Sequence, residues 1–112
     1  GTRSKTMKLT GYIKTITNNG TATTCTLEGD QVYVDGSAEK QNRHNLFWDG
    51  SGVQSEKVEK EYIVDDGLEN FVIAAYTSNR KVEVDVVGAG SARKKGENSG
   101  TSHYKIQSIK LL

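Results

Sequence analysis

The chain contains no proline, one cysteine and one tryptophan among its 112 residues. A single Cys25 can form neither an intrachain disulfide nor a cysteine-rich zinc site, so the fold depends on neither. Uninterrupted apolar runs such as 71–76 extend over only a few residues, so no membrane insertion is expected. A chain of this length provides one domain and excludes two-domain enzymes and doubly wound dinucleotide folds.

Neither positive nor negative charge is in excess. Fifteen Lys and Arg residues against 14 Asp and Glu residues give a net charge of +1, which disfavours nucleic acid or an anionic membrane as the main partner. Residues 1–7 are interpreted as a flexible N-terminal segment and residues 8–112 as one domain. If Met7 is the natural start, the protein is expected in the cytoplasm. If upstream sequence was removed, secretion remains open.

What the chain does contain is β-branched residues and turn signals. Residues 8–17 read as a strand, and Asn18-Asn19-Gly20 favours a tight hairpin turn into a second, half-buried strand at 21–27. The pattern beyond this hairpin predicts a turn at 28–30, a short strand at 31–34, a loop at 35–45, a strand segment at 46–48, a surface segment at 53–60 and a strand at 62–64.

One helix is predicted at about three turns' length. Asp66, with Glu69 three residues later, resembles a capping box at its start, and Asn79 favours the left-handed conformation that follows a helix. The buried face is expected to consist of the apolar residues at helical spacing, which are Leu68, Phe71, Val72, Ala75 and Tyr76.

Two more strands follow the helix. Residues 81–87 alternate strictly, with Val82, Val84 and Val86 on one face. A Gly-rich loop is expected at 88–102, and the last strand, 103–112, loses its alternation between Ile106 and Ile109, which indicates a bulge. Three strands, a helix and two strands predict a mainly β fold: a five-stranded, OB-fold-like Greek-key barrel with one α-helix between strands 3 and 4.

Three segments carry a resemblance to a known group. The stretches 11–20 (GYIKTITNNG), 71–87 (FVIAAYTSNRKVEVDVV) and 104–111 (YKIQSIKL) resemble small bacterial OB-fold proteins, among them the B subunits of subtilase-like and pertussis-like AB5 toxins. They cover about a third of the chain. The resemblance implies a barrel, a tendency to form homo-oligomeric rings, a secreted or periplasmic location and a glycan ligand.

The chain also departs from this group. Such B subunits usually carry a disulfide, for which Cys25 has no partner. Their sugar-binding serine and aromatic positions fall in a region where residues 28–60 do not match, so no binding residue is carried over.

Catalysis and metal binding have little support in the sequence. The two histidines, His44 and His103, lie in polar contexts away from Cys25, so no nucleophile and base are paired. Asp49 and the Asp65-Asp66 pair lack the spacing of a calcium loop and are explained by turn and capping chemistry. We therefore expect a protein that is not an enzyme and that uses no cofactor or metal.

The candidate ligand site is the densest aromatic and polar group in the chain. Exposed aromatic rings stack on sugar faces, while Asn, Ser and Arg supply hydrogen bonds. A strand would place Phe47 and Trp48 on opposite faces, so one of the two is expected in the core. The predicted ligand-binding residues are Tyr33, Arg43, His44, Asn45, Phe47 and Trp48.

The leading hypothesis is thus a binding module for a glycan or a protein partner. The alternative is an intracellular OB-fold that binds single-stranded nucleic acid or assembles into a larger complex, with Arg93, Lys94 and Lys95 in the long loop gripping phosphate. One basic cluster in a near-neutral chain makes this alternative the weaker one.

Overall fold

The computed structural model describes residues 6–34, 37–48, 54–55, 59–92 and 103–112. Its elements in chain order are β1 (Thr6–Asn18), β2 (Thr23–Val34), β3 (Ser37–Asn45), β4 (Phe47–Trp48), β5 (Gln54–Ser55), β6 (Tyr62–Val64), α1 (Glu69–Ser78), β7 (Val82–Ala92) and β8 (His103–Leu111). The fold is mainly β, as the sequence predicts.

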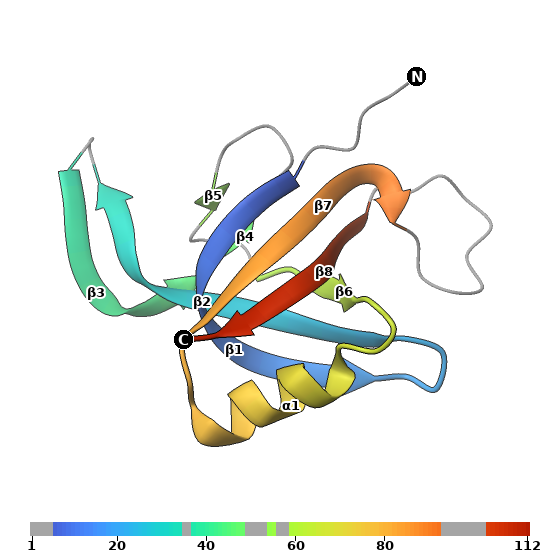
Figure 1. Cartoon of the computed structure of the whole chain (residues 1–112). Coiled ribbons are helices and arrows are strands. Elements are labelled where there is room, and N and C mark those ends of the chain that lie inside the picture. Colours follow the sequence, from blue (N-terminus) through green and yellow to red (C-terminus); the bar gives the residue numbers. More distant parts are fainter. Residues whose placement is uncertain (1–5, 35–36, 49–53, 56–58, 93–102) are drawn as a thin grey trace.

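Five of the strands close into a barrel (Figure 1). Their order is β1, β7, β8, β6 and β2, and β2 pairs again with β1 to complete the circle. All neighbours are antiparallel except β6 and β8, which run parallel. The helix lies in sequence between the third and fourth barrel strands, so the predicted OB-fold-like barrel is confirmed.

The interior of the barrel is apolar and drawn from every barrel strand. Leu9 and Ile13 of β1 and Ile106 of β8 are buried, and the alternating valines of β7 point inward as expected. The fully buried side chains of largest volume are Tyr62, Leu9, Ile106, Val72, Val82, Val84, Val86 and Cys25.

The first hairpin forms where Asn18-Asn19-Gly20 predicts it. Gly20 has a φ of 90°, which the glycine adopts without a steric penalty, and the Asn19 side chain accepts the backbone N–H groups of Thr21 and Ala22. Strand β2 is buried on both faces at 23–27, so the expectation of a half-buried strand is wrong. Thr24 and Thr26 lie between β1 and β6, where their neighbours cover them.

The middle of the chain differs most from its prediction. Strand β2 continues through 28–30, where a turn is expected, and β3 occupies most of the expected loop at 35–45. The reason is backbone pairing: Val32 pairs with Glu39 and Glu28 with Asn45, so the ladder holds a polar sequence in a strand. Strand β3 lies outside the closed barrel, beside β2.

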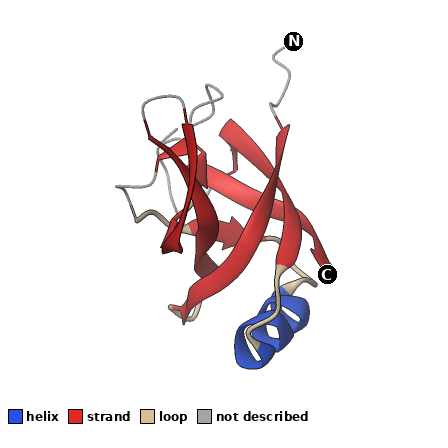
Figure 2. Ribbon diagram, turned by 90° about the vertical axis from the view of Figure 1, so that its left-hand side faces the viewer, coloured by secondary structure: helices blue, strands red, loops and turns tan. Residues whose placement is uncertain are grey.

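The helix covers one end of the barrel (Figure 2). Asn79, with a φ of 54°, ends it in the left-handed conformation, as predicted. The start is different, because Leu68 is the N-cap and no side chain caps the first turn, although the Glu69 carboxylate accepts the Gly67 N–H. Val72 and Ala75 are the buried residues of this helix, and partly buried Leu68 also packs against the core.

Phe71 and Tyr76 were expected on the buried face of this helix, and that expectation is wrong. Their side chains are 54% and 49% exposed. They lie on either flank of the narrow face formed by Val72 and Ala75, because the residues advance by about 100° per position around a helix.

The last two strands contain the predicted bulge. Asp85 pairs with Ser108 and Val86 with Ile106, which leaves Gln107 as an extra residue in β8. Strand β7 extends to Ala92, so residues 88–92 of the expected loop belong to a strand, and the rest of that loop, 93–102, lies outside the described residues. No helix in the described part of the chain is long and apolar enough to cross a membrane.

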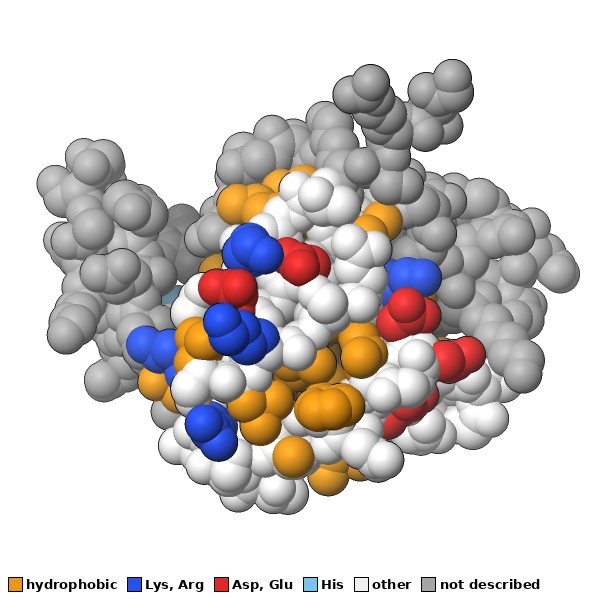
Figure 3. Space-filling model, viewed as in Figure 1, with side chains coloured by type: hydrophobic (Ala, Val, Ile, Leu, Met, Phe, Trp, Pro, Cys, Tyr) orange, Lys and Arg blue, Asp and Glu red, His pale blue; other side chains and the backbone are white. Residues whose placement is uncertain are grey.

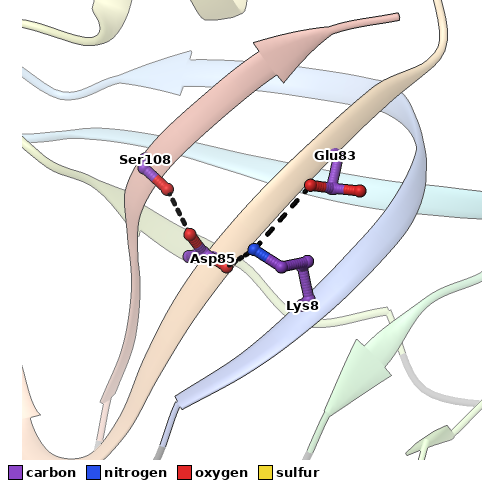
Figure 4. A network of polar contacts seen from close by, with 4 residues as sticks. All are labelled: Lys8, Glu83, Asp85 and Ser108. Carbon is purple, nitrogen blue, oxygen red and sulfur yellow. Dashed lines mark hydrogen bonds and ion pairs between the residues drawn. The ribbon is translucent and has the colours of Figure 1, made fainter.

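A polar network covers the outside of the barrel at β1, β7 and β8 (Figure 4). The Lys8 ammonium lies 3.0 Å from an Asp85 carboxylate oxygen and 3.7 Å from Glu83, and the Ser108 hydroxyl donates to Asp85 at 2.7 Å. These contacts join three neighbouring strands on the solvent side, opposite the apolar interior.

Candidate functional site

The candidate site lies on the outer side of the barrel, where β1, β2 and the end of β3 meet. A β-bulge in β1 leaves Lys14 without a partner in β2, between Ile13, which pairs with Leu27, and Thr15, which pairs with Thr26. The bulge turns the Lys14 side chain toward the last residue of β3. We call the group formed by Lys14, Thr15, Thr26, Asn45 and Glu59 the polar strip.

Direct contacts hold the polar strip together. The Lys14 ammonium donates to the Asn45 amide oxygen at 2.9 Å and to a Glu59 carboxylate oxygen at 2.6 Å. The hydroxyls of Thr15 and Thr26 are 2.6 Å apart. The strip thus combines one positive charge, one negative charge, an amide and two hydroxyls, and it is electrically neutral.

The strip is only partly exposed. Side chains of Lys14 and Glu59 are 33% and 46% exposed, and Thr26 is buried. An ion pair at such a surface contributes little stability, about 0 to 1 kcal/mol. The hydrogen bond from Lys14 to the Asn45 amide oxygen orients that amide.

Two of the predicted ligand-binding residues belong to this region. Asn45 is in the polar strip, and His44 precedes it in β3, opposite Gly29. Arg43 is in the same strand, and Tyr33 lies further along β2, where it pairs with Ala38. The Lys14 contact therefore brings Asn45 to β1, with His44 next to it in the chain, whereas Tyr33 lies toward the turn of the β2 and β3 hairpin.

Phe47 and Trp48 lie elsewhere, in the core. They are 4% and 3% exposed, so both are buried and the expectation that β4 leaves one of them exposed is wrong. The Phe47 ring lies 5.3 Å from that of Tyr62 and 5.2 Å from that of Tyr104, measured between centroids. Their assignment to a ligand site stays a prediction, and their burial gives it no support.

A buried hydroxyl fixes these aromatic residues in place. Tyr62 accepts the backbone N–H of Trp48 at 2.9 Å and donates to the carbonyl of Leu46 at 3.1 Å. Burial raises the pKa of the Tyr62 phenol above its usual range, so it stays protonated and can donate. The indole N–H of Trp48 is buried and has no hydrogen-bond partner among the described residues.

The thiol of Cys25 is not arranged as a nucleophile. Cys25 is 1% exposed, and burial, together with the nearby Glu61 carboxylate, raises its pKa to about 12. A thiol with that pKa is protonated near neutral pH and reacts slowly. Within the described ranges, no group of three or more His, Cys, Asp or Glu residues could hold a metal ion.

The alternative nucleic-acid site, Arg93, Lys94 and Lys95, lies outside the described residues. Asn45 is the one member of the polar strip that the sequence predicted as a site residue. The other four, Lys14, Thr15, Thr26 and Glu59, escaped the prediction, and the contacting pair Lys14 and Glu59 is 45 residues apart in the chain. The available signal was Lys14 itself, a charged residue in the otherwise β-branched run of 13–16.

Comparison of the chain with family models, with curated proteins and with solved structures gives no match.

Proposed function

We propose that this protein is a non-enzymatic binding module that holds a neutral, hydroxyl-rich ligand, a glycan, on its polar strip. OB-fold barrels bind ligands on the face of their second and third strands and on the adjoining loops. Here β2 is the second barrel strand, and the polar strip lies beside it. The proposal rests on the fold and on the chemistry of this surface.

The observation that carries the proposal is the Lys14 ammonium bound to both Asn45 and Glu59. A sugar hydroxyl both donates and accepts, so a surface with fixed donors and acceptors side by side suits it. The internal ion pair also leaves no net charge on the strip. Electrostatic attraction therefore adds little to the binding of a strongly anionic ligand, and a neutral ligand meets no net charge on the strip.

The resemblance to AB5 toxin B subunits supports the glycan as ligand class. A secreted or periplasmic location belongs to the same proposal and rests on that resemblance alone. The other ligand that this binding module is proposed to hold, on the same face, is a protein partner. Single-stranded nucleic acid, through Arg93, Lys94 and Lys95, is the competing function and is tested in parallel.

The test is an NMR titration of backbone amides with a panel of free mono- and disaccharides. We expect at least one sugar to shift the amides of Thr15, Thr26 and Asn45 together, and Asn45→Ala to abolish that shift. Asn70→Ala, on the exposed side of α1, is the matched control and leaves the shift unchanged.

Two results would overturn the glycan proposal. One is the absence of any sugar-dependent shift at the polar strip, and the other is a shift that Asn45→Ala leaves intact. Binding of a single-stranded deoxythymidine oligonucleotide at low salt, where phosphate contacts are strongest, with no response to sugars, would favour the nucleic-acid function instead.

A further inference from the structure

The outer flank of α1 carries an exposed apolar stripe that has no role in the barrel. Glu69, Ile73 and Tyr76 lie at positions i, i+4 and i+7, which places them on one side of the helix. Ile73 and Tyr76 are 47% and 49% exposed, and the core is formed by a different face, that of Val72 and Ala75. We call Glu69, Ile73, Tyr76 and Arg80 the helix stripe.

Charge is separated along the same helix. Asp66 and Glu69 lie at its N-terminal end, and Arg80 follows its C-terminal end, where its Nε donates to the Leu112 carbonyl at 2.6 Å. In the space-filling view, acidic side chains lie at the right-hand end of α1, basic ones at the left-hand end, and apolar ones between them (Figure 3).

This arrangement is self-complementary. When a second α1 is laid antiparallel against the first, with a two-fold axis between residues 74 and 75, Ile73 faces Tyr76 of the other copy. The same axis brings the end of each helix that carries Glu69 beside the end of the other copy that carries Arg80, at both ends of the contact. Antiparallel helices also place the positive end of one helix dipole beside the negative end of the other.

We propose that the helix stripe is a self-association surface and that a second copy of this chain docks on it about a two-fold axis. The interface is isologous, because each copy uses the same residues. It is separate from the polar strip, so it is independent of the proposed glycan function.

The size of the stripe sets the strength of the dimer. A helix of ten residues is ~15 Å long, so the contact falls below the ~1,200 Å² of a standard stable interface. The dimer is therefore transient, in keeping with weak encounters of small area. Its population rises with protein concentration and falls with salt.

The first test measures mass in solution by sedimentation at increasing protein concentration. We expect a monomer that converts to a dimer, and Ile73→Asp to abolish the conversion. Phe71→Asp is the matched control: Phe71 is as exposed as Ile73 but lies on the opposite flank of α1, so this variant dimerises normally. Far-UV circular dichroism checks that both variants remain folded.

The second test uses the charges at the two ends. Glu69→Arg and Arg80→Glu each place like charges opposite one another at both ends of the dimer, and each should weaken it roughly tenfold at low salt. A mixture of the two variants restores both Glu–Arg pairs in the heterodimer. We therefore expect two weakened proteins to associate when mixed, which a purely structural effect of either substitution would not produce.

Three outcomes would overturn the proposal. The protein could stay monomeric up to millimolar concentration, it could form a closed ring of more than two copies, or Phe71→Asp could disrupt association as strongly as Ile73→Asp. Failure of the mixed variants to associate more tightly than either alone would reject the antiparallel register. None of these results bears on sugar binding at the polar strip.

Discussion

The hydroxyl oxygen of Tyr62 lies 2.9 Å from the backbone nitrogen of Trp48. The same hydroxyl donates to the Leu46 carbonyl, so one side chain of β6 satisfies two backbone groups at β4. Tyr62 is fully buried, so its hydroxyl is shielded from bulk solvent. This contact ties the short segment that contains Phe47 and Trp48 to the barrel.

Tyr62→Phe should lower the free energy of unfolding by about 1 to 3 kcal/mol, because it leaves a buried N–H and a buried carbonyl without their partner. Urea denaturation of the two proteins measures the difference. Tyr76→Phe is the control, since the Tyr76 side chain is exposed, and it should change stability by less than about 0.5 kcal/mol. Equal effects of the two substitutions would show that the hydroxyl of Tyr62 does not anchor β4.

Gly88→Ala should destabilise the protein by about 1 to 3 kcal/mol, the usual cost of overpacking. A Cβ at Gly88 would lie 2.5 Å from Cε1 of Tyr104 and 3.2 Å from Cζ3 of Trp48, so the rings must move. Gly29→Ala is the control, because its nearest neighbour would be Leu46 Cδ2 at 3.7 Å, an ordinary contact. If the two thermal midpoints fall equally, close packing at Gly88 is not the cause.

Periodicity located most of the barrel and the residues of α1 that pack on it, but it made the buried face of this helix too wide. Alternation placed Val82, Val84 and Val86 in the core correctly, because a barrel strand has one inward face. Helical periodicity found α1 and its end at Asn79, yet it assigned Phe71 and Tyr76 to the core. The five apolar residues predicted for the buried face span a wider arc of the helix surface than this end of the barrel buries. Nothing in the sequence indicates how much of that arc is buried.

The middle of the chain was less predictable for a different reason. Strand β3 has a polar sequence, and its strand conformation depends on backbone pairing with β2. Asn45 was predicted as a site residue only because the surrounding sequence is rich in aromatic and polar residues. Its contact with Lys14 depends on a bulge in β1 and its environment on Glu59, and neither long-range relation leaves a local pattern in the sequence.

Asp85 should make stability depend on pH in the acid range. Hydrogen bonds from Ser108 and then Lys8 hold the pKa of this carboxyl below 3.8. A lowered folded-state pKa stabilises the protein above the unfolded value, and the effect is lost as pH falls below about 4. The stability difference between the native protein and Asp85→Asn should therefore shrink as pH is lowered through this range.

Urea midpoints at a series of pH values between neutral and strongly acid measure this difference. Ser108→Ala removes the largest cause and should raise the pKa of Asp85, which an NMR titration of its carboxyl carbon detects directly. Asp66→Asn, at an exposed position before α1, serves as the comparison. A difference that stays constant with pH would show that the Asp85 contacts do not form in solution.

The thiol of Cys25 should be protected in the folded protein. Burial raises its pKa from 9.0 to about 12, so the thiolate that reacts with disulfide reagents is scarce at pH 8 and has no access to solvent. Labelling by a chromogenic disulfide should be slow in buffer and fast in urea.

Because the folded-state pKa of Cys25 is raised, the thiol stabilises the protein fully below pH 9, and this contribution declines as pH rises from 9 toward 12. Cys25→Ala should reduce the alkaline decline in the unfolding midpoint, and the remainder belongs to buried Tyr62, whose pKa is also raised. Rapid labelling of the native protein, or an alkaline decline that is unchanged in Cys25→Ala, would place the thiol outside the barrel interior.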